Sequence, residues 1–386
     1  MDSLTQFVGS FSPFGGTFTK SPTKSKKEEQ FKQQNFRRGE SEANDLALQL
    51  ARDWTGAEDV IVLENAYHGH LTTTVQMSPY KFDRGSSIKQ PEWVHVGPAP
   101  DLYRGKYRHA DEDFGDEKKR SELNRKYVDD IRRILERATA EGRRVAAFIA
   151  EAMQSCGGQV VPPRGYFRQV AEVVRAHGGV VIVDEVQTGF GRVGDTFWAH
   201  QLDGEDGEFV PDIVTIGKSM GNGYPIAAVV TRKEIADKHC GAVNYFNTYG
   251  GNPASCAAAL SVLRVIREEN LLEHCRKMGE LFRKELNGLK ERHKSVGDVR
   301  GAGMFWGVDL VKSRCTREPN SELAHKLILK LKREDGVLLS TDGPYGNILK
   351  FKPPLCFGVA DLRESVNALD KALGELSNEE EMRNDV

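Results

Sequence analysis

Apolar residues recur along the chain with two alternating spacings. Continuous apolar runs predict buried strands at residues 60–63, 145–151, 180–185 and 213–216, and a helical period appears between them, as over residues 166–176. Strands that alternate with helices favour a mostly parallel sheet with right-handed crossovers. Polar residues gather where these strands end, which is where open α/β sheets bind ligands. We therefore expect an α/β fold with a mostly parallel central sheet.

Changes in composition and in the spacing of apolar residues divide the chain into three parts. Residues 1–38 are rich in Ser, Gly, Thr and Lys and lack a sustained period, which predicts a disordered arm. Residues 39–270 carry the alternating pattern and are expected to form a large domain. They begin with a helix over residues 41–54, for which Ser41 is the expected N-cap. The composition of residues 271–386 suits a smaller α+β domain.

Composition and charge exclude several kinds of partner. Of the 386 residues, 39% are hydrophobic, which suffices for two cores, and the net charge of -2 gives no general attraction to nucleic acid or to an anionic membrane. The six cysteines contain no C-x-x-C pair, which indicates a reducing compartment and no zinc site. No apolar run approaches the roughly 20 residues of a membrane-spanning helix. We expect an intracellular protein of the mitochondrial matrix or cytoplasm.

A lysine and an aspartate stand at the ends of two predicted strands. Lys218 follows residues 213–216 and has glycines around it, so another group can approach its backbone. Asp184 ends a strand so apolar that its carboxylate needs a specific partner. Together they fit a pyridoxal 5'-phosphate site, with the lysine as Schiff base and the aspartate beside the ring nitrogen. The alternatives are a snorkelling structural lysine and an ion pair of Asp184 with Arg192 or Lys218.

Four longer motifs resemble the class III pyridoxal-phosphate-dependent aminotransferase family. They are EAMQSCGGQVVPPRGYF, VVIVDEVQTGFGRVG, PDIVTIGKSMGNGYPIAAVV and YFNTYGGNPASCAAAL, and the resemblance spans residues 41–376. Shorter motifs such as AYHGH, SCGGQ and LKFKPP are similar to the branch of phospho-lyases that act on ethanolamine phosphate or 5-phosphohydroxy-L-lysine. The resemblance implies the fold type I architecture of pyridoxal-phosphate-dependent transferases, and pyridoxal 5'-phosphate as cofactor.

The resemblance also implies roles for residues around the cofactor ring. Lys218 matches the residue that binds the cofactor and removes the substrate's Cα proton, and Asp184 matches the partner of the ring nitrogen. Tyr67 matches the aromatic residue that stacks on the ring, although a loop residue that only packs is the alternative. Gln187 matches a contact to the ring's 3'-oxygen, and Glu151 matches an acid close to the cofactor.

A second group of residues matches the phosphate end of the cofactor. Gly39 and Ser41 match its phosphate loop, and Thr248 matches a residue that reaches the phosphate from a neighbouring subunit, which implies a homodimer. The family usually reads Ser-Gly-Ser where this chain reads Gly39-Glu40-Ser41. A carboxylate at Glu40 would weaken an anion site at a helix N-terminus. The segment with which family members begin is expected to be missing.

Two lysines, Lys350 and Lys352, are the candidates for a substrate site. Many family members carry arginine at the position of Lys350, where it clamps a carboxylate, and lysine is a poorer bidentate clamp. A phosphorylated amine substrate is therefore favoured, because a leaving phosphate needs cations nearby. The alternative is a pair of lysines on a solvated strand edge.

Three functions follow from these motifs. The first is a lyase that eliminates phosphate and ammonia from ethanolamine phosphate, giving acetaldehyde, or from a related phosphorylated amine. The second is a class III (ω-amino) aminotransferase. The third is a truncated homologue with little or no activity that acts as a binding partner, for which Glu40 and the expected loss of the family's first segment are the evidence.

Overall fold

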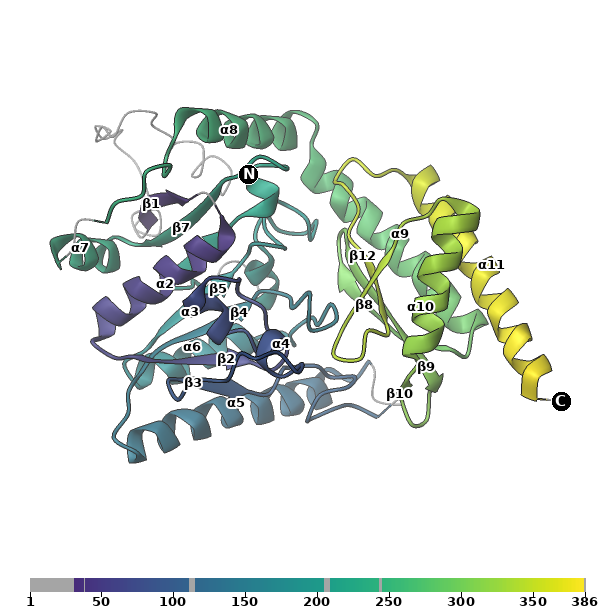
Figure 1. The fold of residues 1–386 in the computed structure, drawn as a ribbon, viewed down its shortest axis with the longest axis horizontal. Coiled ribbons are helices and arrows are strands. Elements are labelled where there is room, and N and C mark those ends of the chain that lie inside the picture. The colour runs from purple at the N-terminus through teal and green to yellow at the C-terminus, as the bar shows by residue number, and fades with distance from the viewer. Residues whose placement is uncertain (1–30, 38, 111–114, 205–208, 243–244, 385–386) are drawn as a thin grey trace. The chain divides into compact units, whose positions relative to one another are not determined.

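The computed structural model describes residues 31–37, 39–110, 115–204, 209–242 and 245–384 (Figure 1). The chain divides into two compact units, and each is described by itself. The first unit contains the described residues up to Ala152 together with Pro162–Phe190 and Phe197–Glu269. The second contains Met153–Val161, Gly191–Thr196 and the chain from Asn270 onward. The second unit thus begins one residue before the expected position and also takes in two short earlier segments.

A mostly parallel sheet forms the centre of the first unit, as the apolar runs predicted. Its seven strands within the described residues lie in the order β1-β7-β6-β5-β4-β2-β3. Neighbours from β6 to β3 are parallel, whereas β7 is antiparallel to β6 and β1 is antiparallel to β7. The strands are β1 (Phe31–Arg37), β2 (Asp59–Leu63), β3 (Val94–Gly97), β4 (Val145–Glu151), β5 (Val180–Asp184), β6 (Ile213–Ile216) and β7 (Ala227–Arg232).

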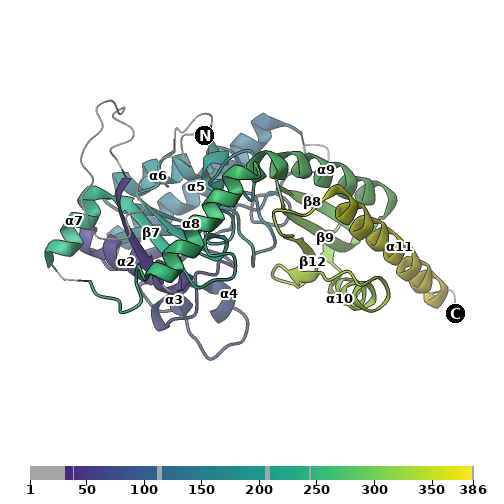
Figure 2. The ribbon, with the colours of Figure 1, turned by 90° about the horizontal axis from the view of Figure 1, so that it is seen from above.

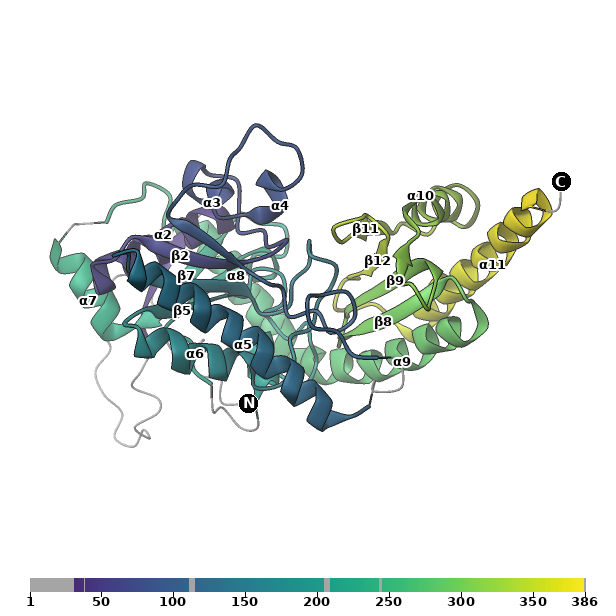
Figure 3. The same cartoon turned by 90° about the horizontal axis from the view of Figure 1, so that it is seen from below.

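Helices cover both faces of this sheet (Figures 2 and 3). Side chains alternate between the faces of a strand, so Ala147 and Ile149 of β4 join one core with helix α2, while Phe148 between them faces the other side. The Phe148 ring lies 6.5 Å from that of Tyr166 in helix α6. The helices are α2 (Glu40–Thr55), α3 (Thr72–Gln76), α4 (Pro79–Phe82), α5 (Glu117–Ala140), α6 (Tyr166–Ala176), α7 (Lys233–Ala242) and α8 (Pro253–Glu268), with the short turns η2 (Ala199–Asp203) and η3 (Lys218–Met220).

The start of α2 differs from the sequence prediction. Its N-cap is Gly39 and not Ser41, so Ser41 lies inside the first helical turn. The Ser41 hydroxyl cannot cap the helix from there, and its Oγ instead accepts a hydrogen bond from the backbone N–H of His70 at 3.1 Å. The helix therefore begins earlier than its apolar period indicated, because glycine can occupy an N-cap position without a side-chain bond.

Strand β1 (Phe31–Arg37) lies in the segment for which disorder was predicted. It pairs with the edge strand β7, with Gln34 opposite Val230 and Asn35 opposite Val229. This pairing is made by backbone hydrogen bonds, so a strand can form here without a recognisable pattern of side chains in the sequence. The rest of the predicted arm, residues 1–30 and 38, lies outside the described residues.

The second unit is built on an antiparallel sheet. Within the described residues its order is β10-β9-β12-β11, and β8 also pairs with β9. Phe282 of α9, Trp306 of β9 and Leu369 of α11 meet in its core. The elements are α9 (Leu271–Arg292), β8 (Val296–Ala302), β9 (Phe305–Ser313), β10 (Glu318–Pro319), α10 (Ser321–Lys330), η4 (Leu331–Asp335), β11 (Ser340–Asp342), β12 (Ile348–Phe351) and α11 (Val359–Asn384).

The two early segments of the second unit are held by close backbone contacts. Gly303 has φ +50°, and a Cβ there would come 2.3 Å from the carbonyl carbon of Val193, so only glycine fits. Next to it, the Met304 N–H donates to Arg192 O at 2.8 Å, and the Gly343 N–H donates to Cys156 O at 3.1 Å. No helix among the described residues combines the length and apolarity that crossing a membrane requires.

Candidate active site

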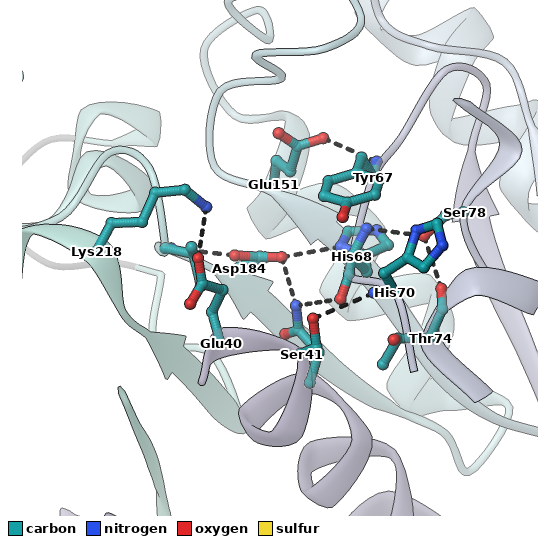
Figure 4. A network of polar contacts seen from close by, with 12 residues as sticks. Glu40, Ser41, Tyr67, His68, His70, Thr74, Ser78, Glu151, Asp184 and Lys218 are labelled. Carbon is teal, nitrogen blue, oxygen red and sulfur yellow. Dashed lines mark hydrogen bonds and ion pairs between the residues drawn. The ribbon is translucent and has the colours of Figure 1, made fainter. Parts of the chain in front are cut away.

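The carboxyl ends of β4, β5 and β6 lie under the N-terminus of α2 (Figure 4). Glu151 ends β4 and lies opposite Asp184, which ends β5. By strand alternation both carboxylates continue the sheet face that α2 covers. Lys218 follows the end of the neighbouring strand β6. Since parallel strands end at the same edge of a sheet, three residues that are far apart in the sequence are brought to one place.

Asp184 is a buried carboxylate that accepts hydrogen bonds from Asn44, His68 and the Val186 N–H. Its side chain is only 4% exposed, and its Oδ2 accepts from Asn44 Nδ2 at 2.8 Å and from His68 Nδ1 at 2.9 Å. Its Oδ1 accepts from the Val186 N–H at 3.0 Å. Because a carboxylate can only accept, His68 must carry its proton on Nδ1. Three such bonds leave one of its roughly four acceptor positions for a ligand.

These partners replace both ion pairs that the sequence left open for Asp184. Arg192 belongs to the second unit, where its Nη1 donates to the backbone oxygens of Met304 at 3.2 Å and Pro353 at 2.9 Å. Burial lowers the pKa of the Arg192 guanidinium. Arg192 therefore supports a loop. Lys218 pairs with a different acid.

Lys218 is not a core lysine. Its Nζ lies 3.0 Å from Glu40 Oε1, and the two side chains are 44% and 37% exposed. Both line a cavity of about 460 Å³, with Tyr224 and Ile226 on its wall. The backbone of Lys218 has φ +33°, an uncommon conformation for a residue with a side chain and one that often marks functional positions. The amine is thus held at the cavity, where a ligand can reach it.

Glu40 is ionised next to this amine. Burial alone raises the pKa of its carboxyl, but a hydrogen bond from its own backbone N–H and the charge of Lys218 outweigh burial, so the pKa lies below its usual range. The sequence placed Glu40 near a phosphate site. It did not indicate the ion pair with Lys218.

The loop that carries Tyr67 is fastened at both ends of the site. The Tyr67 N–H donates to Glu151 Oε1 at 3.2 Å, and its ring meets that of Tyr80 edge to face at 5.9 Å. Two residues later Gly69 has φ +130°, and a Cβ there would lie 2.6 Å from Ser41 Oγ. In Figure 4, Lys218 and Glu40 lie on one side of Asp184, and Tyr67 and His68 lie on the other.

The other three predicted cofactor residues lie on two turns and at the N-cap of α2. Gln187 is half-buried on the turn that follows Asp184. Thr248 lies on an exposed turn between α7 and α8. Gly39 is the N-cap of α2, and its N–H donates to Glu42 Oε2 at 3.4 Å.

Lys350 and Lys352 lie in the second unit and are not on a solvated edge. Lys350 Nζ is 2.9 Å from Asp342 Oδ2, and its side chain is 26% exposed. Lys352 Nζ donates to Ser155 Oγ at 3.3 Å and lies 5.0 Å from the centre of the Phe305 ring. The two lysines are thus held in defined positions on β12 and just beyond its end.

Sequence reasoning missed several residues of these two clusters. Asn44 and His68 are buried and polar, and each therefore needed a partner, but nothing in their spacing pointed to Asp184. Ser155 and Asp342 likewise meet the lysines from distant segments. The one usable signal was Asn44, which is a polar residue on the apolar face of a predicted helix.

These residues fit the cofactor that the sequence suggested. A ring with a protonated nitrogen needs a buried carboxylate, which Asp184 supplies with an acceptor position to spare. An aldehyde needs an amine that can be reached from a cavity, which Lys218 supplies. The misfit is Glu40, whose negative charge lies in the first turn of α2. Among the described residues, no group of three or more His, Cys, Asp or Glu is placed to hold a metal ion.

The chain is similar to a known protein family and to several of its members. The family model for aminotransferase class-III matches residues 30–373. The chain is 57% identical to ethanolamine-phosphate phospho-lyase homolog 1 of Caenorhabditis elegans, over 86% of this chain and 71% of the relative. It is 49% identical to an alanine–glyoxylate aminotransferase 2-like protein of Drosophila melanogaster, over 82% of this chain and 62% of the relative, so it spans less than two thirds of that protein.

A solved structure has the same fold. It is a phospholyase from Arthrobacter in complex with phosphoethanolamine, with a TM-score of 0.82 and 34% identity. The similarity covers 97% of this chain and 82% of that one. The family-model match, the identities and the fold lead to one conclusion: the chain belongs to the class-III aminotransferase family, whose members are pyridoxal-phosphate-dependent enzymes.

Proposed function

We propose that this protein is a phospho-lyase that converts ethanolamine phosphate and water to acetaldehyde, ammonia and inorganic phosphate, or acts likewise on a related phosphorylated amine. The observation that carries the proposal is that a lysine amine at a cavity wall and a buried aspartate stand at the ends of adjoining strands. The names of the phospho-lyase relative and of the phosphoethanolamine complex support the substrate class.

The bound cofactor supplies an electron sink for the carbanion that proton removal leaves on the substrate. Asp184 would accept the ring N–H, and Asn44 and His68 hold its carboxylate in orientation. Lys218 binds the cofactor through Nζ, and when the substrate has displaced it, Nζ accepts the proton from the substrate's Cα. Tyr67, which lies on the other side of Asp184 from Lys218, would cover the ring.

We assign the remaining predicted residues to the rest of the cofactor. Gly39 and Ser41 lie at the start of α2, where helix N–H groups favour a phosphate. Gln187 reaches the ring's 3'-oxygen, and Glu151 fixes the Tyr67 backbone. Thr248, on an exposed turn, reaches the phosphate of a second copy, so the active protein is a homodimer.

Lys350 and Lys352 are assigned to the phosphate of the substrate. When the carbon–oxygen bond breaks, its electron pair leaves with the phosphate, and two ammonium groups stabilise the charge that develops there. Their partners Asp342 and Ser155 hold them in place. Neither lysine can clamp a carboxylate in the bidentate way of an arginine, which agrees with a substrate that has none.

One assay separates the three functions. The protein is loaded with pyridoxal phosphate and given ethanolamine phosphate without any keto acid. Equal release of phosphate, ammonia and acetaldehyde is expected, and Lys218→Ala abolishes it. Amine loss that depends on an added keto acid would establish the aminotransferase, as the name of the Drosophila relative suggests. Turnover in neither assay would favour an inactive binding partner, for which the Glu40–Lys218 pair speaks.

A further inference from the structure

Glu40 is placed to interact with Lys218 and with little else in the site. It lies in the first turn of α2, and its Oε1 is 3.0 Å from Lys218 Nζ. The glycine before the lysine makes room for it, because a Cβ on Gly217 would come 2.9 Å from Glu40 Cβ. The acid therefore packs against the backbone that positions the lysine, and also pairs with its charge.

This contact opposes the chemistry that the lysine is proposed to perform. An amine condenses with an aldehyde only as the neutral base: Nζ bonds to the carbonyl carbon, a C=N bond forms, and the carbonyl oxygen leaves as water. The proton of the original ammonium passes to solvent. A carboxylate at 3.0 Å forms an ion pair with the ammonium group and occupies the approach to Nζ.

We propose that Glu40 is a built-in competitor of the cofactor, which keeps Lys218 as an ion-paired ammonium until the carboxylate is displaced. The inference rests on the proposed function, because it concerns the same lysine. Asp184 is bonded instead to Asn44, His68 and the Val186 N–H, and the acid in contact with Lys218 Nζ is Glu40. The consequence is an enzyme that loads cofactor weakly and is regulated by whatever displaces Glu40.

The same carboxylate also lies at the helix end assigned to the cofactor's phosphate. Glu40 could therefore weaken loading in two ways, by pairing with Lys218 or by repelling the phosphate dianion. Two aldehydes distinguish them. Pyridoxal has no phosphate and reports only on the lysine, whereas pyridoxal 5'-phosphate reports on both.

The test uses the full chain stripped of cofactor, with Glu40→Gln as the variant. Glu42→Gln is the matched control, because Glu42 is an acid in the same helical turn and its removal changes the net charge equally, while the glutamine amide oxygen can still accept the Gly39 N–H. Dissociation constants for both aldehydes are taken from the absorption change. Borohydride reduction followed by peptide mass spectrometry verifies that Lys218 is the residue modified. Far-UV circular dichroism verifies folding.

Glu40→Gln should bind pyridoxal about fivefold more tightly than Glu42→Gln does, which is the upper range for the loss of a partly exposed ion pair. Its affinity for pyridoxal 5'-phosphate should increase by a larger factor. An improvement for the phosphorylated aldehyde alone would overturn the pairing with Lys218. Equal binding by the two variants would overturn any role of Glu40. If no aldehyde modifies Lys218 even in Glu40→Gln, the proposed function itself fails.

A second measurement needs no cofactor. Trace acetylation with acetic anhydride reports how much of each lysine amine is neutral and accessible. Lys218 in Glu40→Gln should be acetylated about fivefold faster than in Glu42→Gln, while Lys312, paired with Glu318 in the second unit, should be unchanged. Glu40→Asp keeps the charge but draws it back by one methylene, and an intermediate rate is expected. Identical rates at Lys218 in all variants would refute the competitor role.

Discussion

Asn44→Ala removes the donor that connects α2 to the proposed cofactor site. Asn44 Nδ2 donates to Asp184 Oδ2 at 2.8 Å and to the backbone oxygen of His68 at 2.9 Å, and the residue is buried. The variant therefore leaves a buried carboxylate with one donor fewer and a buried carbonyl oxygen without this partner. A buried polar group that loses its hydrogen-bond partner lowers the free energy of unfolding.

The magnitude follows from the two bonds. A hydrogen bond to an ionised group contributes about 1.5–3 kcal/mol, and one between neutral groups contributes about 0.5–1.5 kcal/mol. A water molecule admitted to the space of the lost amide would recover part of this. We expect a loss of about 2–3 kcal/mol, a large share of the ~5–15 kcal/mol that stabilises a typical domain. The control Gln49→Ala removes an exposed bond to Asp45 on the same helix and should cost less than about 0.5 kcal/mol.

The assay is urea unfolding followed by circular dichroism, with the midpoint shift converted through the slope m. Since two compact units can unfold separately, hydrogen exchange of peptides from α2 and β5 assigns the loss to the first unit. If Asn44→Ala and Gln49→Ala shift the midpoint equally, the bonds from Asn44 do not hold Asp184, and the reasoning is wrong.

Three further outcomes are expected. Burial raises the pKa of Asp59, but its bonds to Arg143 and His95 outweigh burial, so the pKa lies below its usual value. The stability that this carboxylate contributes is therefore complete above the usual aspartate pKa of about 3.9 and is lost as the pH falls through the lowered value. The urea midpoint of Asp59→Asn should depend less on pH below about 4 than that of the wild type, and parallel curves would contradict this. Gly69→Ala should destabilise by about 1–3 kcal/mol and speed exchange of the His70 amide, whereas Gly85→Ala, also at positive φ but with open space around it, should leave that amide unchanged; equal exchange in both would show that Ser41 is not in the way. Lys350→Ala should lower kcat/KM for ethanolamine phosphate by about tenfold or more, while the exposed Lys312→Ala should not, and equal rates would remove Lys350 from the site.

The sequence was most informative where an apolar strand stops at a charged residue. Glu151, Asp184 and Lys218 could be placed together because parallel strands end at one edge of a sheet. The second layer of the site could not, because Asn44 and His68 reach Asp184 across 140 and 116 residues of chain. Such contacts depend on how elements pack, and no local spacing encodes them.

The same limit explains the errors at the start of the chain. Strand β1 is defined by backbone pairing with β7, which leaves no required pattern in its own residues. The role of Ser41 depends on where α2 begins, and the observed N-cap, Gly39, lies two residues before the expected one. Helix boundaries are decided by tertiary contacts, here the bond from the His70 N–H to the Ser41 hydroxyl.

The chain order of the second unit constrains its biosynthesis. Its sheet closes around Gly303 and Gly343 only when Val193 and Cys156, synthesised long before them, are in place. During synthesis, Met153–Val161 and Gly191–Thr196 therefore leave the ribosome before the rest of their compact unit has been made. Cutting the gene at Asn270 would leave Met153–Val161 and Gly191–Thr196 on the other fragment, so the C-terminal piece would lack two segments of its own compact unit.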